Sequence, residues 1–168
     1  MEIYISDYQT VEKLVHKTQA KYVLSVGNQP ECNDGLLDDL EYLHLQFADI
    51  DKPVPQNFKH AATKEQIQQI IDFAHRWNGD GPLIINCRQG HRRSPAAALI
   101  VMAAVSEHKN YEELLGLIRE HAPHAEPNAW MIRIADYLLG AEDEMNRLLA
   151  IAYKAIKERP SFSYIVFE

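Results

Sequence analysis

Residues 82–105 read PLIINCRQGHRRSPAAALIVMAAV, and in this stretch two apolar runs enclose a polar loop. The first run, PLIIN, is short and bounded by turn residues, which is typical of a buried central strand. After the loop, Ser94 is a good N-cap and Pro95 suits the first position of a helix. The stretch therefore predicts a strand, a glycine-containing loop and a buried helix in direct succession.

The loop in this succession is suited to bind an anion. Its backbone N–H groups turn inward, and the positive end of the following helix points at the same place. Cys87 ends the strand at the floor of this cradle, where a positive field favours the nucleophilic thiolate. Gly90 permits a close approach that a side chain would block. An arginine at the far end of the loop can grip two anionic oxygens at once.

Length and composition indicate the class of protein. The chain has 168 residues, 46% hydrophobic and 24% charged, which fits a soluble domain with its own core. No apolar run is long enough for a transmembrane helix, and the first residues do not resemble a signal peptide. Two cysteines, Cys32 and Cys87, are too few for a disulfide framework, so we expect a cytoplasmic protein. The net charge of −7 argues against nucleic acid or an anionic membrane as a partner.

Strand and helix patterns alternate in the first half of the chain, and only helices follow. Strand-like runs occur at residues 22–26 and 42–47, upstream of the run PLIIN. Thr63 and Gln66 form a capping-box pattern at the start of an amphipathic helix between them and PLIIN. The alternation predicts an α/β fold, with a central, mostly parallel sheet of about four or five strands flanked by helices and a helical C-terminal half.

We expect one domain over residues 1–168, because no linker or repeat divides the chain. Residues 141–168 hold the last predicted helix and an apolar tail, SFSYIVFE. The tail either docks on the domain or adds an edge strand, and its pattern is compatible with both.

The loop CRQGHRRS, residues 87–94, resembles the signature Cys-x5-Arg-Ser/Thr of the cysteine-dependent protein tyrosine phosphatases. Gly90 falls where these enzymes often carry glycine, and Arg93 falls on the signature arginine. Two further features are similar to the compact dual-specificity branch. An aspartate loop lies at residues 48–58, and a Pro-Asn pair at residues 127–128 opens a later helix. The chain looks like a bacterial tyrosine phosphatase of this branch, which implies the dual-specificity-phosphatase fold.

The resemblance covers about residues 22–140 and implies a role for each matching position. Cys87 would attack phosphorus and form a phosphocysteine, while Arg93 and the loop N–H groups hold the phosphoryl oxygens. Ser94 would donate a hydrogen bond to the sulfur and help it leave. An aspartic acid would protonate the leaving group and later activate water. No metal or other cofactor is implied. The remaining loop residues would line the substrate pocket: Arg88, Gln89, Gly90, His91 and Arg92.

Two aspartates of the segment FADID are candidates for this acid. Asp49 follows the strand-like run directly and matches the family position better. Asp51 lies two residues further on and is also within reach of the loop. The resemblance therefore favours Asp49 and leaves Asp51 open.

One position departs from the family pattern. The residue before the cysteine is usually histidine in these phosphatases, and it is Asn86 here. An asparagine side chain can donate and accept hydrogen bonds, so we expect weakened tuning of the thiolate rather than its loss. A homologue that binds phosphoproteins without hydrolysing them is therefore a second hypothesis.

The letters CRQGHR are also similar to the rhodanese loop Cys-Arg-x-Gly-x-Arg. In this third hypothesis Cys87 would carry a persulfide, and Arg92 rather than Arg93 would grip the anion. The chain has no Asp-Val-Arg or Gly-His-Ile segment upstream, which rhodanese domains usually have. An acid loop has no evident role in sulfur transfer, so the sequence favours phosphate monoester hydrolysis.

The phosphatase hypothesis predicts the chemical class of the partner. The substrate would be a phosphorylated protein or a small phosphate monoester, and phosphate, sulfate or vanadate would occupy the same loop. Phosphatases directed at phosphoinositides usually carry lysine inside the loop, and none is present here. The sequence does not indicate the preferred phosphoamino acid or the oligomeric state.

Overall fold

The protein folds around one five-stranded sheet in the order β3-β2-β4-β1-β5. The computed structural model describes residues 1–28, 40–108, 110–152 and 163–166, and Cys32 lies outside them. Four strands are parallel, and β5 runs antiparallel to β1 at one edge. The strands are β1 (Glu2–Asp7), β2 (Tyr22–Gly27), β3 (Glu41–Gln46), β4 (Pro82–Cys87) and β5 (Ser163–Val166).

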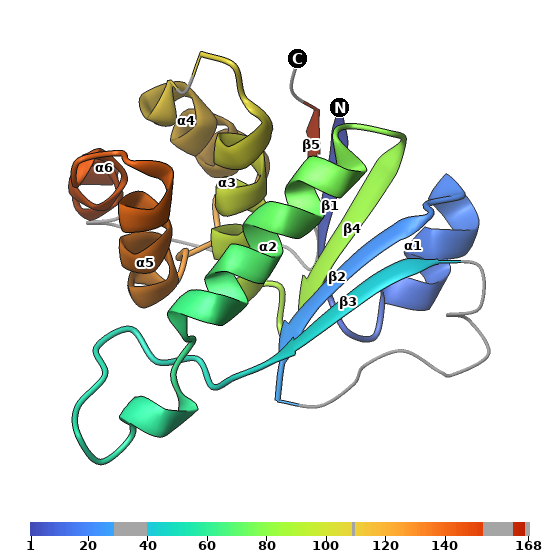
Figure 1. The fold of residues 1–168 in the computed structure, drawn as a ribbon. Coiled ribbons are helices and arrows are strands. Elements are labelled where there is room, and N and C mark those ends of the chain that lie inside the picture. Colours follow the sequence, from blue (N-terminus) through green and yellow to red (C-terminus); the bar gives the residue numbers. More distant parts are fainter. Residues whose placement is uncertain (29–39, 109, 153–162, 167–168) are drawn as a thin grey trace.

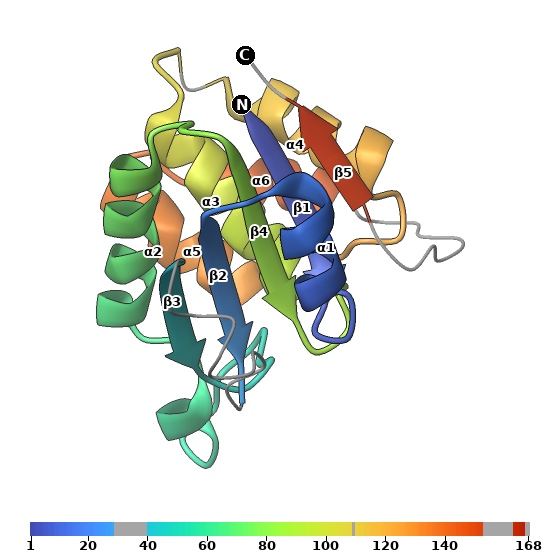
Figure 2. The ribbon, with the colours of Figure 1, turned by 90° about the vertical axis from the view of Figure 1, so that its right-hand side faces the viewer.

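Helices cover both faces of this sheet (Figures 1 and 2). On one face lies α1, whereas α2 to α6 gather on the other. A short 3₁₀ helix, η2, lies between β3 and α2. This arrangement confirms the predicted α/β fold with its helical C-terminal half. The helices are α1 (Val11–Thr18), η2 (Phe58–His60), α2 (Lys64–Trp77), α3 (Arg93–Val105), α4 (Tyr111–His121), α5 (Ala129–Leu139) and α6 (Glu144–Ala152).

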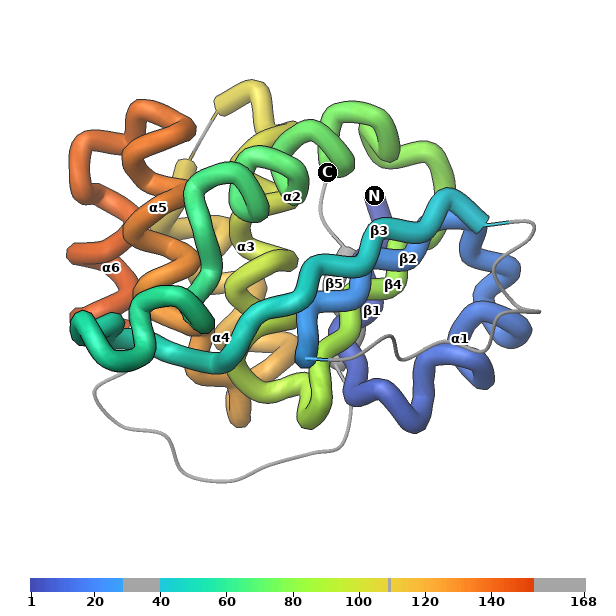
Figure 3. The backbone as a smooth tube through the Cα atoms, turned by 60° about the horizontal axis from the view of Figure 1, so that its bottom comes forward, coloured from blue at the N-terminus to red at the C-terminus, as the bar shows by residue number. Residues whose placement is uncertain are grey.

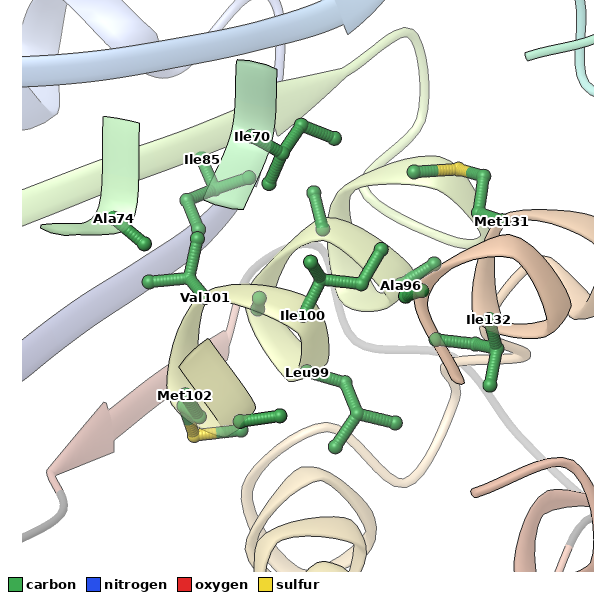
Figure 4. Packing of buried hydrophobic residues seen from close by; sticks show 14 of the residues in the cluster. Ile70, Ala74, Ile85, Ala96, Leu99, Ile100, Val101, Met102, Met131 and Ile132 are labelled. Atoms are coloured by element: carbon green, nitrogen blue, oxygen red, sulfur yellow. The ribbon is translucent and has the colours of Figure 1, made fainter. Parts of the chain in front are cut away.

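The main core lies between the sheet and the layer of α2, α3 and α5 (Figure 4). In it, Ile70 of α2, Ile85 of β4 and Ile100 of α3 are fully buried. The helix α3 is buried on nearly all sides, as its apolar sequence predicts, because neighbouring helices and the sheet surround it. A smaller cluster, which includes Val15 and Val23, lies beneath α1. The central strand and α3 are therefore fixed by apolar packing on both sides.

The carboxyl ends of the four parallel strands lie side by side at one end of the sheet, and this end is turned toward the viewer in Figure 3. The loop 88–92 that links β4 to α3 lies there, and so does the segment 47–57 that leaves β3. Backbone hydrogen bonds tie the chain before α5 to this loop: Glu126 N–H donates to the His91 carbonyl at 2.9 Å, and Asn128 N–H donates to the Arg92 carbonyl at 3.1 Å. Three segments that are distant in sequence therefore meet at the carboxyl end of the sheet.

Local signals at the helix ends are partly confirmed. Thr63 and Gln66 form the predicted capping box at the start of α2. The prediction that Ser94 caps α3 is wrong, because the helix begins one residue earlier, at Arg93. The Ser94 hydroxyl donates instead to the Cys87 sulfur at 3.2 Å, so it is not available to cap the helix. The tail forms the edge strand β5, one of the two possibilities that its sequence left open.

The capping box supports a direct test of what fixes the start of α2. Gln66 N–H donates to Thr63 Oγ1 at 3.2 Å, and Thr63 N–H donates to Gln66 Oε1 at 3.0 Å. We expect Thr63→Ala to lower the free energy of unfolding by about 1 kcal/mol, because it leaves a helix N–H without its acceptor. Thr63→Ser keeps the hydroxyl and should remain within about 0.5 kcal/mol of the wild type. Urea unfolding measures both, and equal losses would contradict a capping role.

Candidate active site

Cys87 ends the central strand β4 and lies beneath the loop 88–92. It is a free thiol with 3% of its surface exposed, and its sulfur accepts a hydrogen bond from Ser94 in the first turn of α3. The first N–H groups of an α-helix have no partner within the helix, and the helix dipole adds positive potential there. The sulfur is therefore positioned at the start of a thirteen-residue helix, where negative charge is stabilised.

Gly90 is the point where this loop approaches the end of β1. It has φ of +65°, in the left-handed region, and a Cβ atom there would lie 3.0 Å from the Ser6 carbonyl carbon and 3.2 Å from the Asp7 nitrogen. Both contacts are with backbone atoms, which cannot rotate aside. Glycine therefore satisfies a conformational and a steric requirement at the same position.

Arg93 is a buried cation whose side chain is held by two neutral acceptors. Its Nη1 donates to the Phe47 carbonyl at 2.8 Å and to Asn28 Oδ1 at 3.1 Å, and only 6% of the residue is exposed. Its Nε atom is buried and has no hydrogen-bond partner among the described residues. Part of the guanidinium is thus fixed by residues that directly follow β2 and β3.

The other loop residues lie in different surroundings, although all were expected to line a pocket. Arg88 and Gln89 are exposed. His91 is buried and stacks on His124, with ring centroids 6.3 Å apart. The Arg92 side chain, 29% exposed, turns toward carboxylates on neighbouring segments. Only part of this group is therefore presented to solvent.

The two candidate aspartates lie next to the loop and are held in different ways. Asp49 Oδ1 accepts from the Asn128 amide at 2.7 Å and lies 3.4 Å from Arg92 Nε. Asp51 Oδ1 accepts from the Ala129 N–H at 2.9 Å, and its Oδ2 pairs with the Arg92 guanidinium. Both oxygens of Asp51 are therefore engaged. Asp49 Oδ2 has no partner among the described residues.

Asn86, the departure from the family pattern, is fully buried next to Ser25 on the neighbouring strand. The Ser25 hydroxyl donates to Asn86 Oδ1 at 2.6 Å, and the two residues are partners in the register of β2 and β4. Sequence reasoning missed this pair, and it also missed the contact of Asn28 with Arg93. The one available signal was that polar residues at the carboxyl ends of neighbouring parallel strands tend to meet.

Comparisons with known proteins identify the fold. No family model matches the chain, and no curated protein matches its sequence. Among solved structures, DUSP15 is 19% identical, with a TM-score of 0.62 over 90% of this chain and 92% of that chain. Human DUSP28 is 11% identical, with a TM-score of 0.63 over 84% of this chain and 93% of that chain. The phosphatase domain of Yvh1 from Chaetomium thermophilum is 14% identical, with a TM-score of 0.61 over 85% and 93%.

The chain has the fold of the dual-specificity phosphatases. At these identities the likeness extends to the fold alone. It agrees with the fold that the signature implied.

The described residues also form a cavity outside the loop that follows Cys87. A cavity of about 460 Å³ lies beside the anchors of Arg93, but its lining includes none of residues 87–94. In residues 1–28, 40–108, 110–152 and 163–166, no group of three or more His, Cys, Asp or Glu side chains could hold a metal ion. Within the same ranges, no helix has the length and apolar character needed to cross a membrane. The candidate site is the loop that follows Cys87, because the thiol, Ser94 and the first turn of α3 lie together there.

The requirement for glycine at position 90 is testable with a matched control. We expect Gly90→Ala to destabilise the protein by at least about 1 kcal/mol more than Gly81→Ala, because both positions are left-handed but only Gly90 faces a backbone clash. Thermal unfolding measures the difference. In addition, vanadate should raise the melting temperature of Gly81→Ala as it does that of the wild type, and not that of Gly90→Ala. Equal destabilisation would show that the contact with Ser6 is unimportant.

Proposed function

We propose that this protein hydrolyses phosphate monoesters through a phosphocysteine at Cys87. The observation that carries the proposal is the buried Arg93 beside the cysteine loop, with an Nε that no described residue satisfies. A buried cation without a carboxylate partner is stabilised when an anion binds, and a guanidinium suits the oxygens of a phosphoryl group. A buried cysteine, a helix N-terminus and this arginine together meet the needs of phosphoryl transfer.

The reaction has two steps. The Cys87 thiolate attacks phosphorus, the bond from phosphorus to the leaving oxygen breaks, and Asp49 gives its proton to that oxygen. The Asp49 carboxylate then takes a proton from water, whose oxygen attacks phosphorus as the sulfur–phosphorus bond breaks. Ser94 donates to the sulfur and stabilises the departing thiolate. Phosphate and the free enzyme are the products, and no cofactor takes part.

The contacts of the two aspartates favour Asp49 as the acid. Asp51 uses one oxygen for the Ala129 N–H and the other for Arg92, so it fastens the acid loop to the start of α5. Asp49 is anchored through Oδ1 alone, and its Oδ2 is available to exchange a proton with a substrate. The substrate is a phosphorylated protein or a small phosphate monoester, as the sequence suggested.

The position of Arg92 argues against a rhodanese-like reaction. In that hypothesis Arg92 would grip the anion, but its guanidinium lies within 4 Å of carboxylate oxygens of Asp49, Asp51 and Glu126. Three acidic neighbours oppose the binding of a further anion there. Arg93, in contrast, has two neutral acceptors and a spare donor.

A first experiment tests the function itself. We expect the wild type to hydrolyse an aryl phosphate, vanadate to block it, and Cys87→Ser to lower kcat by at least about 10³-fold, because the nucleophile is lost. Thiocyanate release from thiosulfate and cyanide should not exceed the blank. Retained hydrolysis in Cys87→Ser would contradict the phosphocysteine. Binding of phosphate without turnover of any phosphate ester would favour a phosphoprotein-binding module.

A second experiment assigns the general acid. Asp49→Asn should lower kcat by about 10²–10⁴-fold and remove the fall in activity at high pH, because that fall reports loss of the acidic proton. Asp51→Asn should retain that fall in activity. The pH dependence of kcat for an aryl phosphate measures both variants. The opposite pattern would assign the acid to Asp51.

A further inference from the structure

Arg92 is the only arginine of the loop whose side chain reaches acidic groups on two other segments of the described structure. Its Nε lies 3.4 Å from Asp49 Oδ1, its Nη2 pairs with Asp51 Oδ2, and its Nη1 lies 3.7 Å from Glu126 Oε2. We propose that Arg92 is a positioning residue that holds the acid loop against the phosphate-binding loop. This proposal rests on the function proposed above and concerns the placement of the acid, not contact with the substrate.

The main chain of Arg92 strengthens the same connection. Its carbonyl accepts the Asn128 N–H at 3.1 Å, and the Asn128 side chain donates to Asp49 at 2.7 Å. Arg92 therefore acts on the acid loop by two routes, directly through its guanidinium and indirectly through the placement of Asn128. Because it also precedes Arg93, its position is fixed by the start of α3.

The acid loop depends on such side-chain contacts because its backbone has few of its own. Residues 47–57 form no helix or strand, and Pro53 and Pro55 have no N–H to donate. Next to the two aspartates, Ala48 N–H donates to the His60 carbonyl and Ile50 N–H to the Ala48 carbonyl, and the other bonds lie at the ends of the segment, from Phe47, Val54 and Asn57. Beyond these bonds, Asp49 and Asp51 are held by Asn128, the Ala129 N–H and Arg92.

Charge explains why an arginine is needed at this position. Asp49, Asp51 and Glu126 all lie within 4 Å of the Arg92 guanidinium, and carboxylates gathered around one cation repel one another. The guanidinium is planar, permanently charged and able to face several oxygens at once. When it is replaced by a neutral side chain, the carboxylates repel, and the acid loop shifts away from the nucleophile.

The test compares substrates that differ in their need for an acid. In Arg92→Gln, kcat/KM for an aryl phosphate with a poor leaving group should fall by about 30-fold or more, since that reaction needs the proton. For an ester with a good leaving group the fall should stay within about 3-fold. Arg92→Lys should recover part of the loss. Equal falls for both esters, with a raised KM, would show that Arg92 binds substrate and would overturn the proposal.

A double-mutant cycle gives a second readout. When Asp49 is already replaced by Asn, adding Arg92→Gln should lower activity by no more than about 2-fold, because both changes remove the same function. If Arg92→Gln lowered the activity of the Asp49→Asn variant as much as it lowers that of the wild type, the two residues would act independently, and the proposal would be wrong. Arg76→Gln is the matched control. The Arg76 Nε atom pairs with Glu41 Oε1 at a distance of 2.8 Å, and neither residue belongs to the loop. Its replacement should leave the ratio of kcat/KM between the two esters unchanged.

A measurement without catalysis separates this proposal from the proposed function. Amide hydrogen exchange at residues 48–52 should become faster in Arg92→Gln and remain unchanged in Arg76→Gln. Unchanged exchange in Arg92→Gln would overturn the positioning role whatever the activity. A wild type that hydrolyses no phosphate ester, with faster exchange in Arg92→Gln, would instead refute the function and leave the structural connection established.

Discussion

A buried guanidinium with no carboxylate partner among the described residues is the constraint on which the candidate site depends. Arg93 is 6% exposed and is held by the Phe47 carbonyl and the Asn28 side chain, and no ion pair joins it to a described residue. A charge in such surroundings is costly unless negative charge is close by. A thiolate at Cys87 and an anion in the loop would both supply it. In the proposed reaction, both of these charges are present.

Two consecutive arginines have opposite surroundings because the chain turns into a helix between them. Arg93 belongs to the first turn of α3 and points into the domain, toward the ends of β2 and β3. Arg92 lies just before the helix and faces the carboxylates of Asp49, Asp51 and Glu126. Among the described residues, three carboxylates lie within 4 Å of the Arg92 guanidinium, whereas Arg93 contacts only neutral acceptors. In the proposed reaction, this difference makes Arg93 the ligand for the phosphoryl group and leaves Arg92 to organise the acid.

The sequence predicted the parts of the molecule that follow from local pattern. The apolar run before Cys87, the capping box of Thr63 and the all-apolar helix after the loop depend on neighbours within a few residues, and each was confirmed. The Ser94 cap was predicted wrongly, because a sulfur seven residues away competes for the same hydroxyl. The second half of the loop was also hard to interpret. The direction of an arginine side chain in the loop depends on carboxylates that belong to other segments.

Contacts between residues that are distant in the sequence could not be predicted from it, for a related reason. Ser25 and Asn86 are 61 positions apart, and they meet because β2 pairs with β4 in a particular register. Likewise, Arg93 and Asn28 are 65 positions apart. Strand order and register arise from the packing of the whole sheet, which no single segment encodes. Such pairs become evident only when the sheet is assembled.

The pair of Ser25 and Asn86 also bears on how the thiolate is stabilised in the proposed reaction. A histidine before the cysteine can carry positive charge, whereas an asparagine amide stays neutral. In this chain the amide carbonyl accepts from Ser25, so this side chain adds a polar link between central strands beneath the loop. The start of α3 lies beside the sulfur, because Ser94 of its first turn donates to Cys87. In the proposed reaction, the neutral Asn86 therefore leaves the charge of the thiolate to be balanced by the start of α3 and by Arg93, which no ion pair joins to a described residue.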